Sequence, residues 1–217
     1  MKCLFVVLLL PILCLAKVRL PAIFSDHSVF QQESGNPIWG WAKPGEEITV
    51  STSWGTAESA IADKEGRWMV ISYTQKAGTG HKVTIEGTNK IILKNVAVGE
   101  VWLCAGQSNM GWSMGNSFEA EKEASVNLPH FRIFKSAREH WHEPLEENRD
   151  RLATWKPCDP KSAAETSAVS YYFGKKLHQK LGVPVGIIQR AFAGTPIEGW
   201  MPWGIQSADP RTIAHKK

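Results

Sequence analysis

The sequence predicts an α/β protein in which an N-terminal β-sandwich-like domain precedes the first part of an α/β/α domain with a parallel sheet. Three observations support this fold class. Short β-prone runs separated by turn residues fill residues 17–98. From residue 99 onward, continuous apolar runs and an amphipathic helix follow in strand, helix, strand order. The length of 217 residues allows one large core or two smaller ones, so both domains fit.

Residues 1–16 have the three parts of a secretory signal peptide. Lys2 supplies the positive charge, an apolar run follows, and Ala16 is a small residue before the cleavage point. The run is too short for a membrane anchor, and Pro11 interrupts it. We therefore expect a secreted or periplasmic protein that has no membrane attachment after cleavage.

The charge balance excludes one class of partner. Lys and Arg number 25, Asp and Glu number 21, and the net charge is +4 with no basic run. A nucleic-acid-binding surface requires a basic patch, so no nucleic-acid partner is expected.

Signal cleavage removes two of the four cysteines and leaves Cys104 and Cys158. In an exported protein these two are able to pair. The alternative is two separate buried thiols, because Cys104 lies in an apolar run typical of a core strand. The sequence leaves both open.

The β domain is predicted from six β-prone runs with turn residues between them. The runs are residues 38–41, 47–51, 56–62, 68–72, 82–86 and 90–93. The turns are residues 43–46, 63–66, 78–80 and 87–89.

The second region begins with residues 101–104, an apolar run typical of a strand buried on both faces. Residues 131–134 are a second candidate strand and residues 184–189 a third. Residues 139–160 are predicted to be a loop that either lines a site or merely connects. A helix is predicted between this loop and the third strand, and Gly182 ends it. Its apolar stripe is expected to face the core. The stripe consists of Val169, Tyr172, Phe173, Lys176, Leu177 and Leu181.

The strongest candidate for chemistry is Ser108 in the run Gly106-Gln107-Ser108-Asn109-Met110. It follows the 101–104 strand, and ligands of parallel sheets bind at the carboxyl ends of strands. A serine on a glycine turn there is placed to act as a nucleophile. Met110 occupies the position where the nucleophile elbow of α/β-hydrolases has glycine, so it is not that motif. The alternative is a serine that only caps a helix.

Residues 98–110, VGEVWLCAGQSNM, closely resemble the first conserved block of the sialate O-acetylesterase family. These are SGNH-type carbohydrate esterases, related to acetylxylan esterases. Further similar blocks lie on both sides of this one, in the family's order, and together they cover nearly all of the mature chain. They are residues 24–32, 39–46, 168–174, 182–188 and 193–200. The resemblance implies that residues 99–217 are the N-terminal part of an SGNH-type esterase domain.

The resemblance implies that Ser108 removes acetyl groups from O-acetylated carbohydrates without a cofactor. The backbone N–H groups of Ser108 and Gly194 would form part of the oxyanion hole. Ala193 replaces a glycine that the family usually has, and it would impair the loop if that position requires a positive φ or close approach of the substrate. No metal-ligand spacing or dinucleotide fingerprint occurs in the sequence.

Two family blocks are absent: Gln-Gly-Glu and the C-terminal Asp-x-x-His that supplies the histidine and acid of the triad. The resemblance therefore implies a chain truncated at its C-terminus, with activity in doubt. A serine without a base is a poor nucleophile. The histidines that remain as candidates are His140, His142 and His215, the last six residues after Asp209.

Two other functions stay open at this point. One is an inactive fragment that acts at most as a glycan-binding or interaction module. The other is a different serine hydrolase, such as a lipase or peptidase. The sequence specifies neither the acetylated sugar nor the oligomeric state.

Tryptophan positions add a structural expectation. Trp39, Trp41, Trp68 and Trp102 lie on predicted strands and are assigned to the core. The loop tryptophans either pack at the rim or stack on sugar rings; they are Trp112, Trp141, Trp200 and Trp203.

Overall fold

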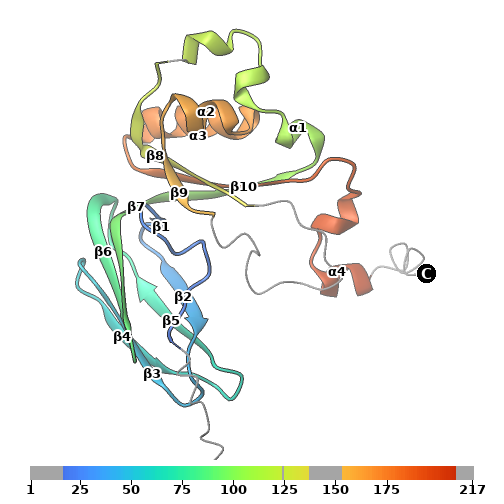
Figure 1. Cartoon of the computed structure of the whole chain (residues 1–217). Helices are drawn as coiled ribbons and strands as arrows, with labels where there is room; N and C mark the ends of the chain where they lie inside the picture. The colour runs from blue at the N-terminus through green and yellow to red at the C-terminus, as the bar shows by residue number, and fades with distance from the viewer. Residues whose placement is uncertain (1–16, 124, 137–152, 209–217) are drawn as a thin grey trace, which may run out of the picture.

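The computed structural model describes residues 17–123, 125–136 and 153–208, and it shows the two predicted regions one above the other (Figure 1). The lower region is formed by strands alone. The upper region has helices packed on a sheet. The predicted α/β class with an N-terminal β-sandwich-like part is confirmed.

The β domain consists of two sheets. A two-stranded antiparallel sheet pairs β2 (Gly35–Trp41) with β5 (Arg67–Tyr73). The facing sheet contains β4 (Ala57–Ile61), β3 (Glu47–Thr52), β6 (Gly78–Glu86) and β7 (Lys90–Gly106) in that order. A short strand, β1 (Val29–Gln31), pairs in parallel with β7.

Alternation along these strands places apolar side chains between the two sheets. The core includes Ile38 and Trp68 from one sheet and Val50, Ile85 and Val96 from the other, each at most 3% exposed. Five of the six predicted runs lie within strands, and the run 56–62 extends one residue beyond each end of β4. The predicted turn at residues 78–80 is wrong, because these residues belong to β6, where a register shift accommodates them.

The strand β7 connects the two regions. Residues 90–93 and 101–104, predicted as separate strands, belong to this single strand of 17 residues. Its first half pairs with β6 and its second half pairs in parallel with β10 (Val185–Ala191). The expected domain boundary between residues 98 and 99 therefore falls inside a continuous strand.

The upper region continues the same sheet in the order β7, β10, β8, β9. β10 is parallel to β7 and to β8 (Leu128–Lys135), as predicted. β9 (Trp155–Cys158) is antiparallel to β8 and leads into α2 (Pro160–Glu165). The prediction of a loop over residues 139–160 is thus wrong from Trp155 on, and residues 139–152 lie outside the described residues.

The remaining elements are helical. α1 (Ser108–Gly111), η1 (Met114–Asn116) and η2 (Ala120–Glu123) follow β7. α3 (Ala168–Leu181) is the predicted long helix, and η3 (Ile197–Trp200) and α4 (Trp203–Ala208) follow β10. None of the helices in the described ranges is long and apolar enough to span a membrane.

The face of α3 that packs on the sheet differs from the prediction. Its buried residues are Ser170, Tyr171 and Gly174, whereas Val169 and Phe173 of the predicted stripe are 53% and 40% exposed. Gly174 explains this orientation, because a Cβ there would lie 2.5 Å from the Phe131 ring on β8. The helix approaches the sheet through its smallest residue, and much of the apolar stripe remains at the surface.

Two further expectations concern Trp102 and the cysteines. Trp68 is buried as predicted, but Trp102 is 42% exposed and contacts Phe173 edge-on at 5.1 Å between ring centroids. Assigning Trp102 to the core was therefore wrong. Assigning Trp39 and Trp41 to the core was wrong as well, because both are only half-buried and lie opposite Met69 and Arg67 of β5. Cys104 and Cys158 are both buried and unpaired, which confirms the alternative of two separate thiols.

Candidate active site

The candidate site lies at one edge of the sheet, where β7 and β10 end. Gly106 at the end of β7 is opposite Ala191 at the end of β10, and the Phe192 N–H donates to the Gly106 carbonyl at 2.9 Å. Because the strands are parallel, the segments that follow them leave from the same edge. Figure 1 shows α1 and the chain after β10 at this common end. Ser108 and Gly194 both lie in these segments.

A tight turn presents Ser108. It is the first residue of α1, whose first helical bond runs from the Gly111 N–H to the Gln107 carbonyl at 3.0 Å. An added Cβ at Gly106 would lie 3.1 Å from the Met110 Cβ. The turn therefore brings these two residues into close contact at a position occupied by glycine. Ser108 is exposed, as a nucleophile that must reach a substrate has to be.

The base of α1 is anchored to α3 through Met110. The hydroxyls of Ser167 and Ser170 donate to its sulfur at 3.5 and 3.4 Å. The Ser167 N–H in turn donates to Oε1 of Gln189, a residue of β10 that is 3% exposed. Linked polar contacts between largely buried side chains of this kind favour one arrangement. They therefore position the turn that carries Ser108.

The loop after β10 is held by Thr195. Its hydroxyl donates to the Phe192 carbonyl at 2.8 Å and accepts from Trp200 Nε1 at 2.9 Å. The Gln107 side-chain amide donates to the Thr195 carbonyl at 3.2 Å. Gln107 immediately precedes Ser108, so this bond ties the serine turn to the loop that carries Gly194.

Gly194 has a φ of +77°, in the left-handed region that favours glycine. A Cβ at this position would meet no atom within 4 Å, so the requirement comes from the backbone and not from crowding. Ala193 is not among the residues with a positive φ. The replacement of a family glycine by Ala193 therefore does not strain this loop.

None of the described histidines hydrogen-bonds to Ser108. His27, His81 and His178 have other partners: Asn95, Ser53 and the Val183 carbonyl. His130 lies near the start of β8, which begins at the opposite edge of the parallel pair. The other candidates lie outside the described residues; they are His140, His142, His215 and Asp209.

The two cysteines do not compete with Ser108 as nucleophiles. Burial raises the pKa of the Cys104 thiol, and burial raises the pKa of Cys158 to about 12. Both thiols stay protonated at neutral pH, and the reactive form of cysteine is the thiolate.

The loop tryptophans differ in their surroundings. Trp112, which follows α1, is 58% exposed, and its Nε1 donates to the Asn116 carbonyl. Trp200 is half-buried against Thr195. Trp203 begins α4, and Trp141 lies outside the described residues.

The comparisons with known proteins agree with this geometry. A family model described as carbohydrate esterase, sialic acid-specific acetylesterase, matches residues 98–210. The chain belongs to this family. The matched region begins within β7 and contains both Ser108 and Gly194, so the site described above lies in the esterase part of the chain.

Named relatives of this esterase family are similar over most of the chain. The sialate O-acetylesterase of Mus musculus is 30% identical over 200 residues, which cover 84% of this chain and 37% of the relative. The sialate O-acetylesterase of Homo sapiens is 29% identical, with coverages of 84% and 38%. The present chain thus spans well under half the length of these relatives.

A solved structure supports the same family. A carbohydrate acetylesterase from Xanthomonas citri matches with a TM-score of 0.81 and 31% identity, over 90% of this chain and 45% of that one. The match extends beyond the esterase part, because 90% of the chain includes most of the β domain.

The sequence singled out Ser108 and Gly194, which remain candidates, but not the residues that position them. The Gln107 side chain ties the serine turn to the Gly194 loop, and the Gln189 side chain of β10 accepts from Ser167 at the start of α3. A signal for Gln189 was present, because a polar residue at the end of the apolar run 185–188 is unusual in a buried strand.

Proposed function

We propose that the chain carries a carbohydrate O-acetylesterase site in which Ser108 is the nucleophile. The observation that supports this most is the meeting of Ser108 and the left-handed Gly194 loop at one sheet edge, tied by the Gln107–Thr195 hydrogen bond. An exposed serine beside candidate oxyanion donors is the arrangement that acyl transfer requires.

The proposed reaction proceeds in two steps. Ser108 Oγ attacks the acetyl carbonyl carbon, and the backbone N–H groups of Ser108 and Gly194 donate to the oxyanion that forms. The sugar hydroxyl leaves with a proton, and Ser108 carries the acetyl group. Water then attacks the acetyl-serine, and acetate is released with the serine regenerated.

The serine requires a general base, and none of the described histidines hydrogen-bonds to it. A histidine in this role accepts the proton only when neutral. We therefore expect kcat/KM to rise with pH through about 6.5, the usual pKa of histidine. A flat profile between pH 5 and 8 (roughly one and a half units on either side of that pKa) would argue against a histidine base.

Hydrolysis of an aryl acetate by the purified chain tests the nucleophile. We expect Ser108→Ala to lower kcat/KM by at least about 100-fold, because removing the nucleophile of a serine site abolishes the acyl-enzyme path. Ser125→Ala is the matched control, since Ser125 is exposed and lies outside the site. Equal rates for wild type and Ser108→Ala would refute the assignment.

The same assay separates the alternatives. Faster hydrolysis of long acyl esters or peptides than of acetates would indicate a lipase or peptidase. No serine-dependent hydrolysis at all would indicate an inactive module. Comparing the rates of hydrolysis of O-acetylated sialic acid and acetylated xylan identifies which acetylated sugar is the substrate.

We also propose that the protein is exported. The support is the charged, apolar and small-residue pattern of residues 1–16. Expression of the whole chain in a secreting host, followed by N-terminal analysis, is expected to give a mature chain that begins at Lys17. An intact Met1 terminus in the exported fraction would contradict this.

A further inference from the structure

The outer face of the β2–β5 sheet carries aromatic and apolar side chains. Trp39 is directly opposite Met69, and Trp41 is directly opposite Arg67. Directly opposite residues point to the same face of an antiparallel pair. Trp68, next to Arg67 in sequence, points to the other face and is 3% exposed in the core. Trp39, Trp41 and Met69 therefore face away from the core.

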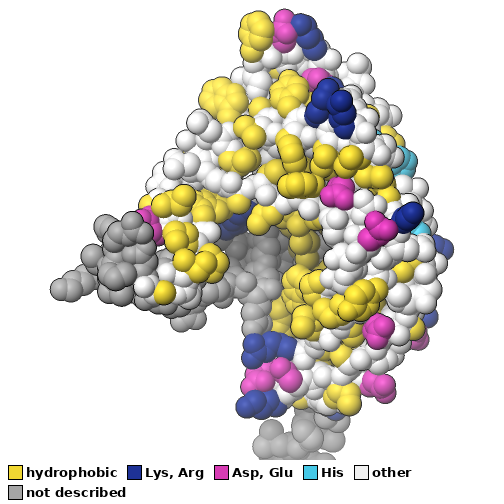
Figure 2. Space-filling view, turned by 180° about the vertical axis from the view of Figure 1, so that it is seen from behind, with side chains coloured by type: hydrophobic (Ala, Val, Ile, Leu, Met, Phe, Trp, Pro, Cys, Tyr) yellow, Lys and Arg dark blue, Asp and Glu magenta, His cyan; other side chains and the backbone are white. Residues whose placement is uncertain are grey.

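A cavity of about 480 Å³ opens on this face. Its lining includes Trp39, Trp41 and Met69, together with the charged side chains of Asp63 and Arg67. Ligand pockets typically measure about 300–1,000 Å³ and combine aromatic walls with a few polar groups. Figure 2 shows hydrophobic side chains gathered on the lower domain, beside a group of charged side chains.

Both indole rings are held in place before any ligand binds. The Arg19 guanidinium lies 3.7 Å from the centroid of the Trp41 ring. Trp39 packs edge-on against Phe24 with 4.7 Å between ring centroids. A platform that is already ordered loses little side-chain entropy on binding.

The polar side of the cavity is also ordered. Asp63 Oδ1 accepts from the backbone N–H groups of Glu65 and Arg67 at 2.9 and 2.8 Å. Its Oδ2 lies 3.8 Å from Arg67 Nε, and both side chains are about half exposed. The carboxylate thus offers an oriented acceptor beside a guanidinium donor at the cavity wall.

The structure assigns this cavity as a binding site for a pyranose ring of a glycan. A pyranose has an apolar C–H face, which packs on indole rings, and a rim of hydroxyls. These hydroxyls are able to donate to Asp63 and accept from Arg67, as charge-assisted hydrogen bonds. The indole rings fit the apolar face of the sugar, and the charged side chains fit its hydroxyls, so the two sides of the cavity together are complementary to a pyranose.

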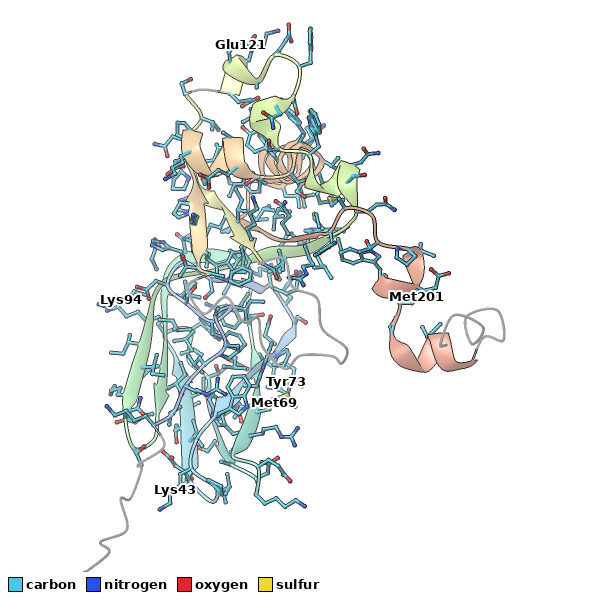
Figure 3. The ribbon with its side chains drawn as sticks, turned by 45° about the vertical axis from the view of Figure 1, so that its right-hand side comes forward. Lys43, Met69, Tyr73, Lys94, Glu121 and Met201 are labelled. Carbon is cyan, nitrogen blue, oxygen red and sulfur yellow. The ribbon has the colours of Figure 1, made fainter. Side chains whose placement is uncertain are left out.

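The face continues beyond the cavity in one direction along β5. Met69 and Tyr73 lie on the same side of this strand, and they are 59% and 66% exposed (Figure 3). Tyr73 therefore extends the platform for a second ring of the same glycan. The cavity belongs to the β domain and shares no lining residue with the Ser108 edge, so it would hold a glycan independently of hydrolysis.

Titration of the purified chain with xylotetraose and with 3′-sialyllactose, followed by saturation-transfer NMR, tests the site. We expect saturable binding of at least one of these glycans. Trp41→Ala is expected to weaken it about tenfold, which is the value of one well-stacked ring. Trp41→Phe, which retains an aromatic face, is expected to keep most of the affinity.

A second variant and two controls keep the test decisive if Trp41→Ala fails to fold, which thermal melting will show. Asp63→Asn is expected to weaken binding about threefold or more, since hydrogen bonds to a charged acceptor are stronger. Ile92→Ala, on the exposed side of β7, and Trp112→Ala, near the Ser108 edge, are expected to leave it unchanged.

Two results would overturn the assignment. One is the absence of saturable binding for both glycans. The other is binding that Trp112→Ala abolishes while Trp41→Ala and Asp63→Asn leave it intact, because the glycan would then occupy the Ser108 edge.

Discussion

The two halves of β7 differ in a way that separates the two regions of the molecule. In the first half, Val96, Ala97 and Val98 are fully buried, whereas Trp102 and Leu103 in the second half are 42% and 67% exposed. Residues 90–98 pair with β6 and residues 97–99 with β1. Residues 100–106 pair with β10 alone among the described strands.

The difference shows that burial depends on neighbouring elements as much as on side-chain type. Both halves are equally apolar in sequence, but only the first lies between two sheets. Strands of a parallel sheet are normally covered on both faces. The β domain buries its core between its own two sheets, while the described part of the esterase region leaves Trp102, Leu103 and Phe173 at the surface.

The largest loss of stability is expected from a substitution at Arg132 of β8, where the two regions meet. This residue is fully buried, and its guanidinium donates to the carbonyls of His27, Ser28 and Asn95. Burial lowers the pKa of Arg132 to about 10, so it stays charged at neutral pH. We expect Arg132→Met to destabilise the protein by about 3–5 kcal/mol, because it strands these carbonyls.

Chemical denaturation measures this change, with Arg67→Met as the control. Arg67 forms an exposed ion pair with Asp63 and is expected to contribute no more than about 1 kcal/mol. Similar losses for both variants would show that Arg132 does not hold the two regions together.

A smaller loss of stability is expected from a substitution at Gly174 of α3, within the esterase region. Gly174→Ala places a Cβ 2.5 Å from the Phe131 ring and 3.0 Å from Ile187. We expect a loss of about 1–3 kcal/mol, as for other overpacked cores. Gly199→Ala is the matched control, because its Cβ would meet nothing within 4 Å. Equal melting temperatures for the two variants would show that α3 tolerates a wider spacing.

A pH effect is expected in the same region. Glu123 lies on η2; burial acts to raise its pKa, but hydrogen bonds from Lys175 and Tyr171 outweigh burial and lower it. A carboxyl whose pKa is lowered in the folded state stabilises the fold above its unfolded pKa. This contribution is lost as the pH falls through the folded value.

Glu123→Gln therefore removes a pH-dependent contribution. We expect a loss of about 1.5–3 kcal/mol at neutral pH, typical of hydrogen bonds to a charged group. The gap between variant and wild type is expected to shrink as the pH is lowered below the usual glutamate range. A constant gap from pH 7 to pH 3 (a window around the ordinary glutamate pKa of about 4.3) would argue against this carboxylate as the titrating group.

A substitution at Leu103 is expected to change stability least. It is expected to change self-association measurably. Exposed apolar patches next to an unpaired strand edge promote self-association. We expect the chain to form oligomers or aggregates and Leu103→Lys to shift it toward monomer in light scattering. Ile92→Lys, at a 43% exposed position of the first half of β7, is expected to change little. A monomeric wild type would contradict the expectation that the exposed second half of β7 promotes self-association.

Local patterns predicted most of the strands and the long helix, since alternation and caps depend on neighbouring residues. Gly182, for example, ends α3 with a φ of +69°, as its position after Leu181 indicates. The continuity of β7 was not predictable, because residues 94–100 contain a glycine and polar residues that look like a linker in isolation.

Which side chains are buried was harder to predict than which elements form. The stripe of α3 has the helical period of a core-facing surface, but the close approach at Gly174 orients Tyr171 inward. Trp102 lies on a strand of the expected type, but its burial depends on elements distant in sequence. At the site, Ser108 followed from its motif, whereas the bond between Gln107 and Thr195 depends on a register that one strand alone does not reveal.

Labelling with an aryl or alkyl fluorophosphonate tests the central claim about Ser108 most directly. An activated serine displaces fluoride from phosphorus and retains the phosphonyl group. We predict one adduct, located at Ser108 by peptide mass spectrometry and absent from Ser108→Ala. No adduct, or an adduct on Ser113 or Ser117 that persists in Ser108→Ala, would contradict the account.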